Sequence, residues 1–187
     1  MKICIDAGHG GHDPGAQNTR VGVDEKAIVL MYATVLEGLF LAGGHSVVMT
    51  RDGDRFVELR DRAAIANREN IDAFIALHAN ACGDPAVRGI EFWTTPGQTK
   101  ADACATGMFN SVRTEFPDRN YRVDMRDDDP DREADFYVLK HTNAPAVLIE
   151  LEFISNDDAA NWLNDPIVVQ RYCRAVMDGI IEWNART

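Results

Sequence analysis

Two segments of this chain are apolar along almost their whole length, and they constrain the fold more than any other feature. They read IDAFIALHAN (71–80) and APAVLIELEF (144–153). A strand with apolar side chains on both faces must be covered on both faces. Parallel strands joined by helical crossovers meet this condition, because the crossover helices lie on the two faces of the sheet. The sequence therefore predicts a mainly parallel, twisted sheet between two layers of helices.

The rest of the chain alternates between strand and helix patterns, which is typical of an α/β fold. Further strands are predicted at 2–6, 45–51 and 88–95, and helices at about 25–41, 56–69, 98–116, 156–164 and 166–184. Residues 117–135 are irregular and polar, and the short segment FYVL (136–139) is ambiguous. The 187 residues contain no linker, internal repeat or low-complexity tract. We therefore expect a single three-layer domain over 1–187.

The charge balance is acidic, with a net charge of −11. We expect no nucleic-acid partner, because attraction to phosphates needs a basic face. No stretch approaches the ~18 consecutive apolar residues of a membrane span, so membrane insertion is not expected. The N-terminal MKICIDAGHG has one Lys and three apolar residues before Asp6, which is unlike a signal peptide. Synthesis in the cytoplasm without a signal peptide follows as an expectation.

Much of the acidity lies in one run, DDDPDREAD (127–135), which predicts a solvated loop. A calcium-binding loop would need a Gly and a ligand spacing that this run lacks. The four cysteines, Cys4, Cys82, Cys104 and Cys173, lie far apart and form no C-x-x-C pair. Three of them, all except Cys82, sit in apolar periodic segments. Reduced, packed thiols are therefore expected.

Four groups suited to metal-assisted hydrolysis fall where predicted strands end or a helix begins. His9, His78 and Glu150 belong to three strand ends, and Glu25 opens the first long helix. Functional groups gather at the carboxyl ends of parallel strands, so these side chains can converge. Two imidazoles and a carboxylate suit a catalytic Zn²⁺, and a second carboxylate can be a general base. Taken singly, each residue also has a structural interpretation, such as a carboxylate that complements the helix dipole at Glu25.

Five longer segments carry a family resemblance, in this order along the chain: ICIDAGHGGHDPGA (3–16), GHSVVMTRDGDRFVELRDRAAIAN (44–67), DAFIALHANA (72–81), RGIEFW (88–93) and APAVLIELEFISN (144–156). Together they resemble the zinc-dependent N-acetylmuramoyl-L-alanine amidases, often called the amidase type 3 family. The first, third and last segments are the most specific. The resemblance extends through nearly the whole chain.

The resemblance implies that His9, Glu25 and His78 bind Zn²⁺ and that Glu150 is the catalytic carboxylate. One position departs from the family, because Glu152 stands where Gly is more frequent. Strand side chains alternate, so Glu150 and Glu152 are predicted on the same side of their strand. Glu152 then either takes part in the reaction beside Glu150 or changes the shape of the rim of the cleft.

Several neighbouring residues keep two interpretations. Asn80 is a candidate for orienting a ligand or binding peptide, and a turn-forming Asn is the equal alternative. His141 is a candidate for the substrate groove or for a structural role. His12 is the alternative to His9 as a ligand, although the family register favours His9. His45 is expected to be exposed.

Three further side chains are given a structural interpretation in preference to a functional one. Cys82 lies four residues after His78, but the strand ends between them, which disfavours a thiolate ligand. Arg51 and Arg60 suit substrate carboxylates, but buried structural ion pairs are the favoured interpretation.

The resemblance implies hydrolysis of the amide between N-acetylmuramic acid and the L-alanine of the stem peptide of peptidoglycan. Glu150 would accept a proton from the attacking water and pass it to the leaving amine. Two alternatives are a zinc peptidase or deacetylase acting on other wall amides, and a wall-binding module with an inactive site. We expect a monomer, a phage endolysin or a bacterial autolysin, that reaches the cell wall after release during phage or mother-cell lysis.

Overall fold

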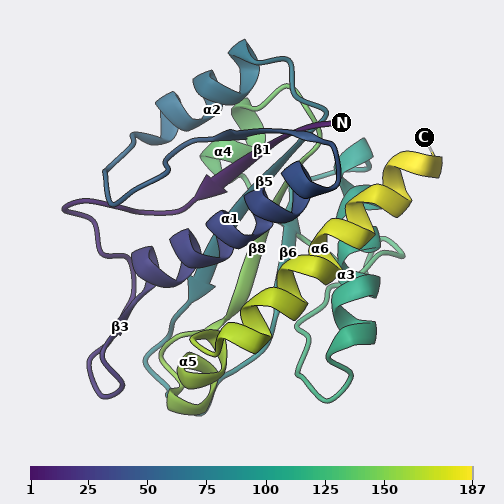
Figure 1. Cartoon of the computed structure of the whole chain (residues 1–187). Helices are drawn as coiled ribbons and strands as arrows, with labels where there is room; N and C mark the ends of the chain where they lie inside the picture. Colours follow the sequence, from purple (N-terminus) through teal and green to yellow (C-terminus); the bar gives the residue numbers. More distant parts are fainter. Residues whose placement is uncertain (187) are drawn as a thin grey trace.

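The centre of the molecule is a six-stranded sheet in the order β4-β1-β5-β8-β6-β7. Its middle strands β1, β5, β8 and β6 are labelled in Figure 1. Its strands are β1 (Lys2–Ala7), β4 (Ser46–Met49), β5 (Ala73–Asn80), β6 (Glu91–Thr94), β7 (Arg132–Glu133) and β8 (Ala146–Phe153). Strands β4, β1, β5 and β8 run parallel to one another. Strand β6 runs antiparallel to β8, and β7 pairs with β6 in the same direction as β6. A separate two-stranded sheet pairs β2 (Gln17–Asn18) with β3 (Val23–Asp24). The computed structural model, which describes residues 1–186, thus confirms the mainly parallel sheet.

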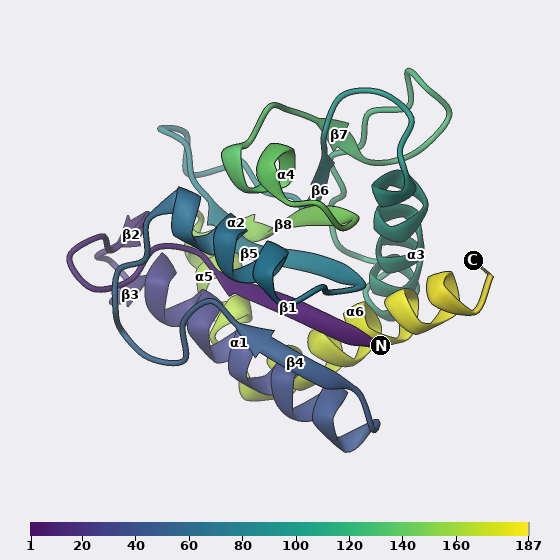
Figure 2. The ribbon, with the colours of Figure 1, turned by 90° about the horizontal axis from the view of Figure 1, so that it is seen from above.

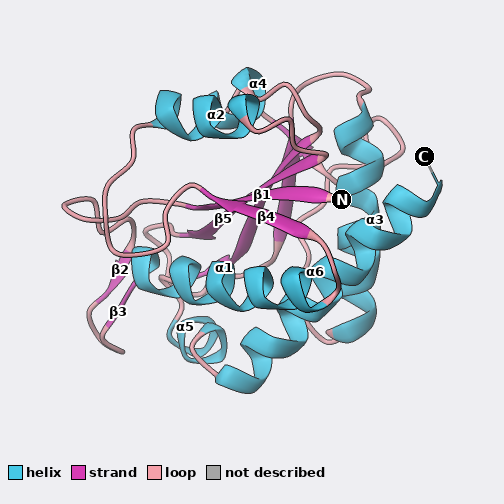
Figure 3. Ribbon diagram, turned by 45° about the horizontal axis from the view of Figure 1, so that its top comes forward, coloured by secondary structure: helices cyan, strands magenta, loops and turns pink. Residues whose placement is uncertain are grey.

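Helices cover both faces of this sheet, as Figures 2 and 3 show. One face carries α1 (Glu25–Ala42), α3 (Lys100–Glu115), α5 (Asp157–Leu163) and α6 (Pro166–Arg186), and the other carries α2 (Leu59–Arg68) and α4 (Tyr137–His141). Ile3 and Ile5 belong to the larger apolar cluster, with α1 and α6, whereas Cys4 between them belongs to the smaller cluster under α2 and α4. The side chains of β1 therefore contribute to two apolar cores, one on each face of the sheet, which confirms the three-layer α/β fold. No helix in the described part of the chain combines the length and apolar character needed to cross a membrane.

Several element boundaries differ from the sequence prediction. Helix α2 begins at Leu59 rather than at 56, because Glu58 before it has an extended backbone. The ambiguous FYVL segment is mostly helical, since Tyr137 opens the five-residue α4. The strands expected at 45–51 and 88–95 contract to four residues each. Strands β2, β3 and β7 have only two residues each, which is too short for a period-two pattern to reveal.

The acidic run 127–135 is only partly solvated, which corrects the prediction of a solvated loop. Asp131 is 2% exposed and accepts a hydrogen bond from Thr94 Oγ1 at 2.6 Å. Burial raises the pKa of Asp131 to about 8; the Thr94 hydrogen bond opposes this shift, and the neighbouring Asp129 and Asp102 carboxyls add to it. The charge pattern alone does not separate this buried carboxyl from the solvated ones around it.

The parallel topology brings three strand ends to one edge of the sheet. β1 ends at Ala7, two residues before His9. On β5 and β8, His78 and Glu150 are neighbours in register, so their side chains leave the same face of the sheet. This is the face under α2 and α4, because Ala76 and Leu148 of the same strands belong to the smaller cluster.

Candidate metal centre and active site

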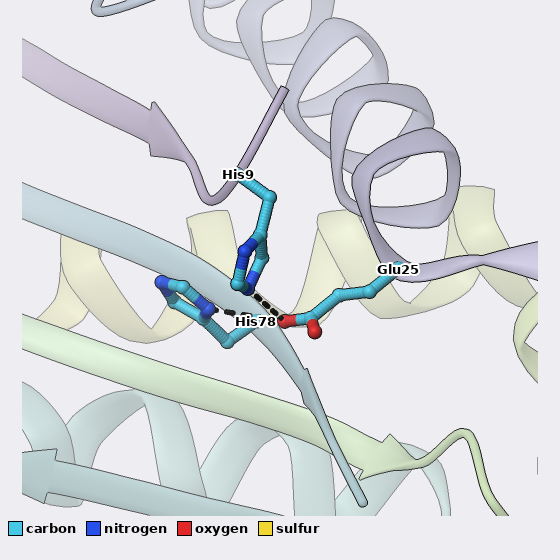
Figure 4. Close-up of side chains that lie close together, drawn as sticks. All are labelled: His9, Glu25 and His78. Atoms are coloured by element: carbon cyan, nitrogen blue, oxygen red, sulfur yellow. Dashed lines mark hydrogen bonds and ion pairs between the residues drawn. The ribbon is translucent and has the colours of Figure 1, made fainter. Parts of the chain in front are cut away.

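Three predicted ligands converge on one point, as Figure 4 shows. His9 Nε2 and His78 Nδ1 each lie 3.0 Å from the same oxygen, Glu25 Oε1. The three ligand atoms lie within 4.8 Å of one another, and no other group of three or more His, Cys, Asp or Glu side chains in residues 1–186 does so. The acidic run 127–135 therefore supplies no such group. The sequence prediction of this cluster agrees with the geometry.

Glu25 is held from two sides by backbone amides. Its Oε1 accepts a hydrogen bond from Ala79 N at 2.9 Å, and its Oε2 accepts one from Ala16 N at 2.9 Å. Burial alone would raise the pKa of Glu25, but hydrogen bonds with His78 and His9 hold it well below its usual range. The carboxylate is thus a fixed negative charge, 5% exposed, between two imidazoles.

His9 is oriented by a residue that the sequence prediction missed. Asp13 Oδ2 lies 2.8 Å from His9 Nδ1, so His9 Nε2 is left to face Glu25. The backbone of His9 has a positive φ of 59°, a conformation that costs free energy for a residue with a Cβ. A carboxylate behind the imidazole fixes its tautomer and is a frequent partner of metal-binding histidines. The signal available in the sequence was the His-x-x-x-Asp spacing in HGGHD.

Two glycines leave the space that the ligands occupy. A Cβ on Gly8 would lie 2.3 Å from His78 Cε1. A Cβ on Gly15 would lie 2.6 Å from Glu25 Oε2 and 2.7 Å from His9 Cδ2, and the φ of Gly15 is +65°. The glycine-rich loop therefore allows close approach of the backbone to the ligands.

A buried arginine, Arg51, holds this loop against the sheet. Arg51 donates to four backbone carbonyl oxygens, those of Ala7, Gly8, Lys26 and Gly53. It forms no ion pair within residues 1–186, so the predicted buried ion pair is wrong for Arg51. Arg60 is also mispredicted, because it is exposed and lies 3.3 Å from Asp61 at the surface.

The buried ion pair belongs instead to Arg62, which the sequence prediction missed. Its Nη1 lies 2.8 Å from Asp6 Oδ1, and its Nη2 donates to His9 O at 2.7 Å. Both side chains are almost fully buried. Arg62 thereby ties the backbone of His9 to Asp6 near the end of β1.

The donor set fits a zinc ion. Two imidazole nitrogens and one carboxylate oxygen are ligands that Zn²⁺ takes in catalytic sites, with a fourth position left open. Bonds of about 2.0–2.1 Å in a tetrahedron place ligand atoms roughly 3.3 Å apart. The two 3.0 Å separations at Glu25 Oε1 would need to widen by only a few tenths of an ångström.

The pKa values of both histidines in this cluster are raised by the carboxylates around them. Burial would lower the pKa of His78, but its hydrogen bond to Glu25 and the nearby Glu150 raise it overall. The pKa of His9 is raised in the same way, against its burial, by Glu25 and then Asp13. Positive charge at the centre of the cluster is therefore favoured, which is the electrostatic condition for binding a cation.

Glu150 lies beside this cluster rather than within it. It pairs with His78 across β5 and β8, and its Oε2 is buried without a hydrogen-bond partner among residues 1–186. Burial raises the pKa of Glu150 to about 7; His78 opposes the shift, and the carboxylates of Glu25 and Glu91 add to it. A carboxyl group with a pKa near neutrality can both accept and return a proton.

A second carboxylate next to Glu150 was missed by the sequence prediction. Glu91 stands opposite Glu150 in the antiparallel β6–β8 pair and is 3% exposed. Its Oε1 accepts from Arg122 Nε at 2.6 Å, and its Oε2 accepts from Asn80 Nδ2 at 3.1 Å and Trp93 Nε1 at 3.0 Å. The only signal in the sequence was a lone Glu inside the apolar strand RGIEFW.

The three residues predicted for substrate binding lie in different surroundings. Asn80 belongs to the Glu91 network. Glu152 is fully buried, and its Oε2 accepts hydrogen bonds from the backbone amides of Gly89 and Phe153, not from a residue of the His9–Glu25–His78 cluster. His141 is exposed at the end of α4, where its ring stacks on Tyr137 with centroids 3.9 Å apart. The structure therefore does not bring Glu152 or His141 into the cluster.

The alternative ligands also lie outside the cluster. His12 is exposed and packs on Phe56, and Cys82 is exposed with its Sγ near Asp84 O. His45 is half-buried against Phe40 rather than exposed, which corrects the prediction. All four cysteines are free thiols, and the three predicted to be packed are buried.

A pocket opens from His9 and His78 toward α2 and α4. Its walls include the segment 56–59 that precedes and begins α2, Arg62 of α2 and Val138 of α4. His9 and His78 of the cluster are therefore accessible from this side of the sheet.

Comparisons with known proteins agree with this geometry. A family model described as N-acetylmuramoyl-L-alanine amidase matches residues 3–182. The chain is 34% identical to the endolysin of Bacillus phage SPP1, over 96% of this chain and 65% of that protein. It is 32% identical to the sporulation-specific N-acetylmuramoyl-L-alanine amidase of Bacillus subtilis, over 96% of this chain and 67% of that protein. The chain thus spans about two thirds of the length of these relatives.

Solved structures show the same fold over the whole chain. The N-acetylmuramoyl-L-alanine amidase AmiC2 of Nostoc punctiforme matches with a TM-score of 0.89 at 29% identity, over 100% of this chain and 98% of that one. The catalytic domain of CwlV from Bacillus (Paenibacillus) polymyxa matches with a TM-score of 0.89 at 29% identity, over 100% and 99%. The chain belongs to the N-acetylmuramoyl-L-alanine amidase family.

Proposed function

We propose that this chain is a zinc-dependent N-acetylmuramoyl-L-alanine amidase, a peptidoglycan hydrolase that cleaves the amide between N-acetylmuramic acid and the L-alanine of the stem peptide. The observation that carries the proposal is the position of Glu150 next to His78, on the same face as a cluster of three metal-ligand atoms. A hydrolase needs this combination of a cation site and an adjacent proton acceptor. Membership of the family supports the choice of substrate.

In this proposal His9 Nε2, His78 Nδ1 and Glu25 Oε1 hold the metal. Zn²⁺ bound there would polarise the scissile carbonyl and lower the pKa of a water molecule. Asp13 keeps the proton of His9 on Nδ1, so that Nε2 remains available as a ligand.

Glu150 moves the proton. Its unpartnered Oε2 accepts a proton from the attacking water, and the same oxygen then donates it to the leaving amine of L-alanine. Burial supports both steps, because it brings the pKa of the carboxyl to about 7 and so lowers the free-energy difference between its two protonation states.

We further propose that residues 1–187 act as the catalytic domain, as a monomer, on the bacterial cell wall. The endolysin and sporulation relatives support release during phage or mother-cell lysis as the setting. Size-exclusion chromatography with light scattering tests the monomer, and lysis assays on intact and permeabilised cells test whether access from inside is needed.

Product analysis tests the reaction itself. Purified peptidoglycan is digested, the zinc content of the protein is measured, and the released fragments are analysed by mass spectrometry. New N-terminal L-alanine with intact glycan strands is the expected result. New N-termini inside the stem peptide would indicate a peptidase, loss of acetyl groups a deacetylase, and binding without products an inactive wall-binding module.

A further inference from the structure

The side chain of Arg122 is built into the edge of the proposed active site. Its segment is fixed to the start of β6 by two backbone hydrogen bonds, Ile90 N to Asn120 O at 2.9 Å and Arg122 N to Ile90 O at 3.0 Å. Gly89 leaves room for the aliphatic part, because a Cβ there would lie 2.7 Å from Arg122 Cγ. The guanidinium carbon lies 5.4 Å from the centre of the Phe153 ring. Backbone, glycine and aromatic ring together fix where the guanidinium lies.

The guanidinium is anchored by one nitrogen and leaves two others available. Arg122 Nε donates to the buried Glu91 at 2.6 Å, and the side chain is 43% exposed. Its two terminal nitrogens have no hydrogen-bond partner within residues 1–186. Asn80 and Trp93 also donate to Glu91, so Arg122 is not the only group that stabilises the buried carboxylate. A guanidinium held in this way presents a planar pair of donors, which matches a carboxylate.

The register of strands β5, β8 and β6 places the Arg122 guanidinium close to His78 and Glu150 of the proposed active site. His78, Glu150 and Glu91 form a row across β5, β8 and β6. Adjacent strands lie about 4.8 Å apart, so Glu91 is two spacings, or about 10 Å, from His78. Trp93 packs on the cluster under α2 and α4, so the row lies on the face of the sheet that carries the pocket.

The chemistry of peptidoglycan decides which part of the substrate meets Arg122. The lactyl carboxyl of N-acetylmuramic acid is consumed in the scissile amide, so free carboxylates occur only in the peptide. The first of them is the α-carboxylate of the second residue, a D-glutamate linked through its γ-carboxyl. Two residues span at most about 7 Å, which suits the distance from the cleaved bond to a guanidinium beside Glu91.

We propose that Arg122 binds the α-carboxylate of the second stem-peptide residue, and that the enzyme prefers walls in which this group is a free acid to walls in which it is an amide. This inference rests on the proposed amidase function. It also sets the direction of the substrate: the peptide extends over β6 toward Arg122, and the glycan strand leaves on the other side of Glu150.

The test uses two preparations of purified cell wall that differ only in whether the second residue carries an α-carboxylate or an α-carboxamide. Release of N-terminal L-alanine is measured at low and saturating wall concentrations for the wild type, Arg122→Gln, Arg122→Lys and Arg113→Gln. Arg113 is an exposed arginine on α3 that packs over Phe109, so its variant is a matched loss of one charge. Zinc content and circular dichroism show whether each variant is folded.

For the wild type we expect a kcat/KM roughly tenfold higher on the free-acid wall, which corresponds to one charged hydrogen-bonded contact. Arg122→Gln should abolish the preference by raising KM on the free-acid wall alone, with kcat unchanged. Arg122→Lys should keep part of the preference, because it keeps the charge but not the planar donor pair. Arg113→Gln should keep all of it.

Two results would overturn the inference while leaving the amidase function intact. One is equal cleavage of both walls by the wild type. The other is an equal loss on both walls in Arg122→Gln, which would assign Arg122 only to stabilising Glu91. Absence of N-terminal L-alanine from either wall would instead overturn the proposed function, and this inference with it.

Discussion

Hydrogen bonds within the protein hold the side chains of Glu25 and His9 in place. Two backbone amides fix the carboxylate of Glu25, and Asp13 fixes the ring of His9. Little side-chain freedom remains to be lost when a metal binds, which favours tight binding. Glu150 differs from these residues, because its Oε2 has no partner in the described part of the chain. At the residue scale, the proposed function therefore assigns metal binding and proton transfer to different groups.

This separation predicts the behaviour of Glu150→Gln. The substitution keeps the size of the side chain but removes the proton acceptor, so kcat/KM should fall by about 10²–10⁴-fold, the usual contribution of a general base. Zinc should remain at one equivalent, because Glu150 is not a member of the ligand cluster. The measurements are product release from peptidoglycan and metal analysis of the purified variant.

Glu182→Gln is the matched control for Glu150→Gln. Glu182 is an exposed residue of α6 paired with Arg186, and surface pairs of this kind contribute little to stability. Its activity and zinc content should equal those of the wild type. Near-normal activity in Glu150→Gln would show that another group accepts the proton.

The sequence predicted the three residues that form the candidate metal cluster but not their supporting partners. His9, Glu25 and His78 could be predicted because they stand at strand and helix ends and within specific motifs. Glu91 could not, because its place opposite Glu150 depends on the antiparallel register of β6, which no sequence pattern reveals. Arg62 rather than Arg51 or Arg60 forms the buried ion pair, since the orientation of arginines before and within a short helix depends on packing.

At the element scale, two glycines allow the chain turns that lead into the first helix: Gly15 in the loop between β1 and β2, and Gly22 in the turn between β2 and β3. Both have positive φ, of 65° and 72°, so an alanine at either position strains the backbone. Only at Gly15 would a Cβ also collide with Glu25 and His9; at Gly22 nothing lies within 4 Å. A comparison of alanine variants at Gly15 and Gly22 therefore separates the effect of backbone strain from that of crowding Glu25 and His9.

We expect Gly22→Ala to lower the free energy of unfolding by about 1 kcal/mol and to leave zinc affinity unchanged. Gly15→Ala should lower stability by more and weaken zinc binding at least tenfold, because two ligands must move. Zinc affinity is measured by competition with a chelator, and stability by urea unfolding of the metal-free proteins. Equal zinc affinity in the two variants would contradict the proposed crowding.

The buried carboxyl group of Asp131, directly before β7, should make the stability of the fold depend on pH. The pKa of the Asp131 carboxyl is about 3.9 in an unfolded chain and about 8 in the folded protein, because burial favours its protonated form. Its stabilising contribution is therefore present below pH 4 and is lost as the pH rises through 8. Asp131→Asn cannot ionise, so it should be more stable than the wild type above pH 8 and differ least near pH 5.

Thermal unfolding from pH 5 to 9 measures this difference, with Asp158→Asn as the control. Asp158 is an exposed residue of α5, so its replacement should not change the pH profile. A difference between Asp131→Asn and the wild type that stayed constant over this range would exclude the proposed ionisation.

Long elements could be predicted from the sequence better than short ones. β5 and β8 have eight residues each and α1 has eighteen, which is enough for periodicity to be recognised. α4 has five residues, fewer than two helical turns, and its helical state depends on packing over β8 rather than on a local pattern. The buried position of Asp131 likewise follows from the pairing of β7 with β6 and not from the acidic run itself.

At the scale of the whole molecule, the metal cluster links segments that are distant along the chain. His9 follows β1, Glu25 opens α1 and His78 lies near the end of β5, and each of these elements packs into the larger apolar cluster. The three ligands come together only when the loop, the first helix and the central strand are all in place. A metal that binds these ligands therefore binds the folded state and not the unfolded chain, and it must stabilise the whole domain.

This linkage predicts the effect of removing zinc. At a free zinc concentration of about 1,000 Kd, binding adds about 4 kcal/mol to the free energy of unfolding, which for a domain of this size raises Tm by roughly 10 °C. Thermal unfolding of chelator-treated protein, before and after zinc is restored, measures the shift. His78→Ala removes one ligand, so its Tm should not respond to zinc, whereas Glu150→Gln should show the full shift because it leaves the cluster intact. The same response in His78→Ala and the wild type would place the stabilising metal somewhere other than between His9, Glu25 and His78.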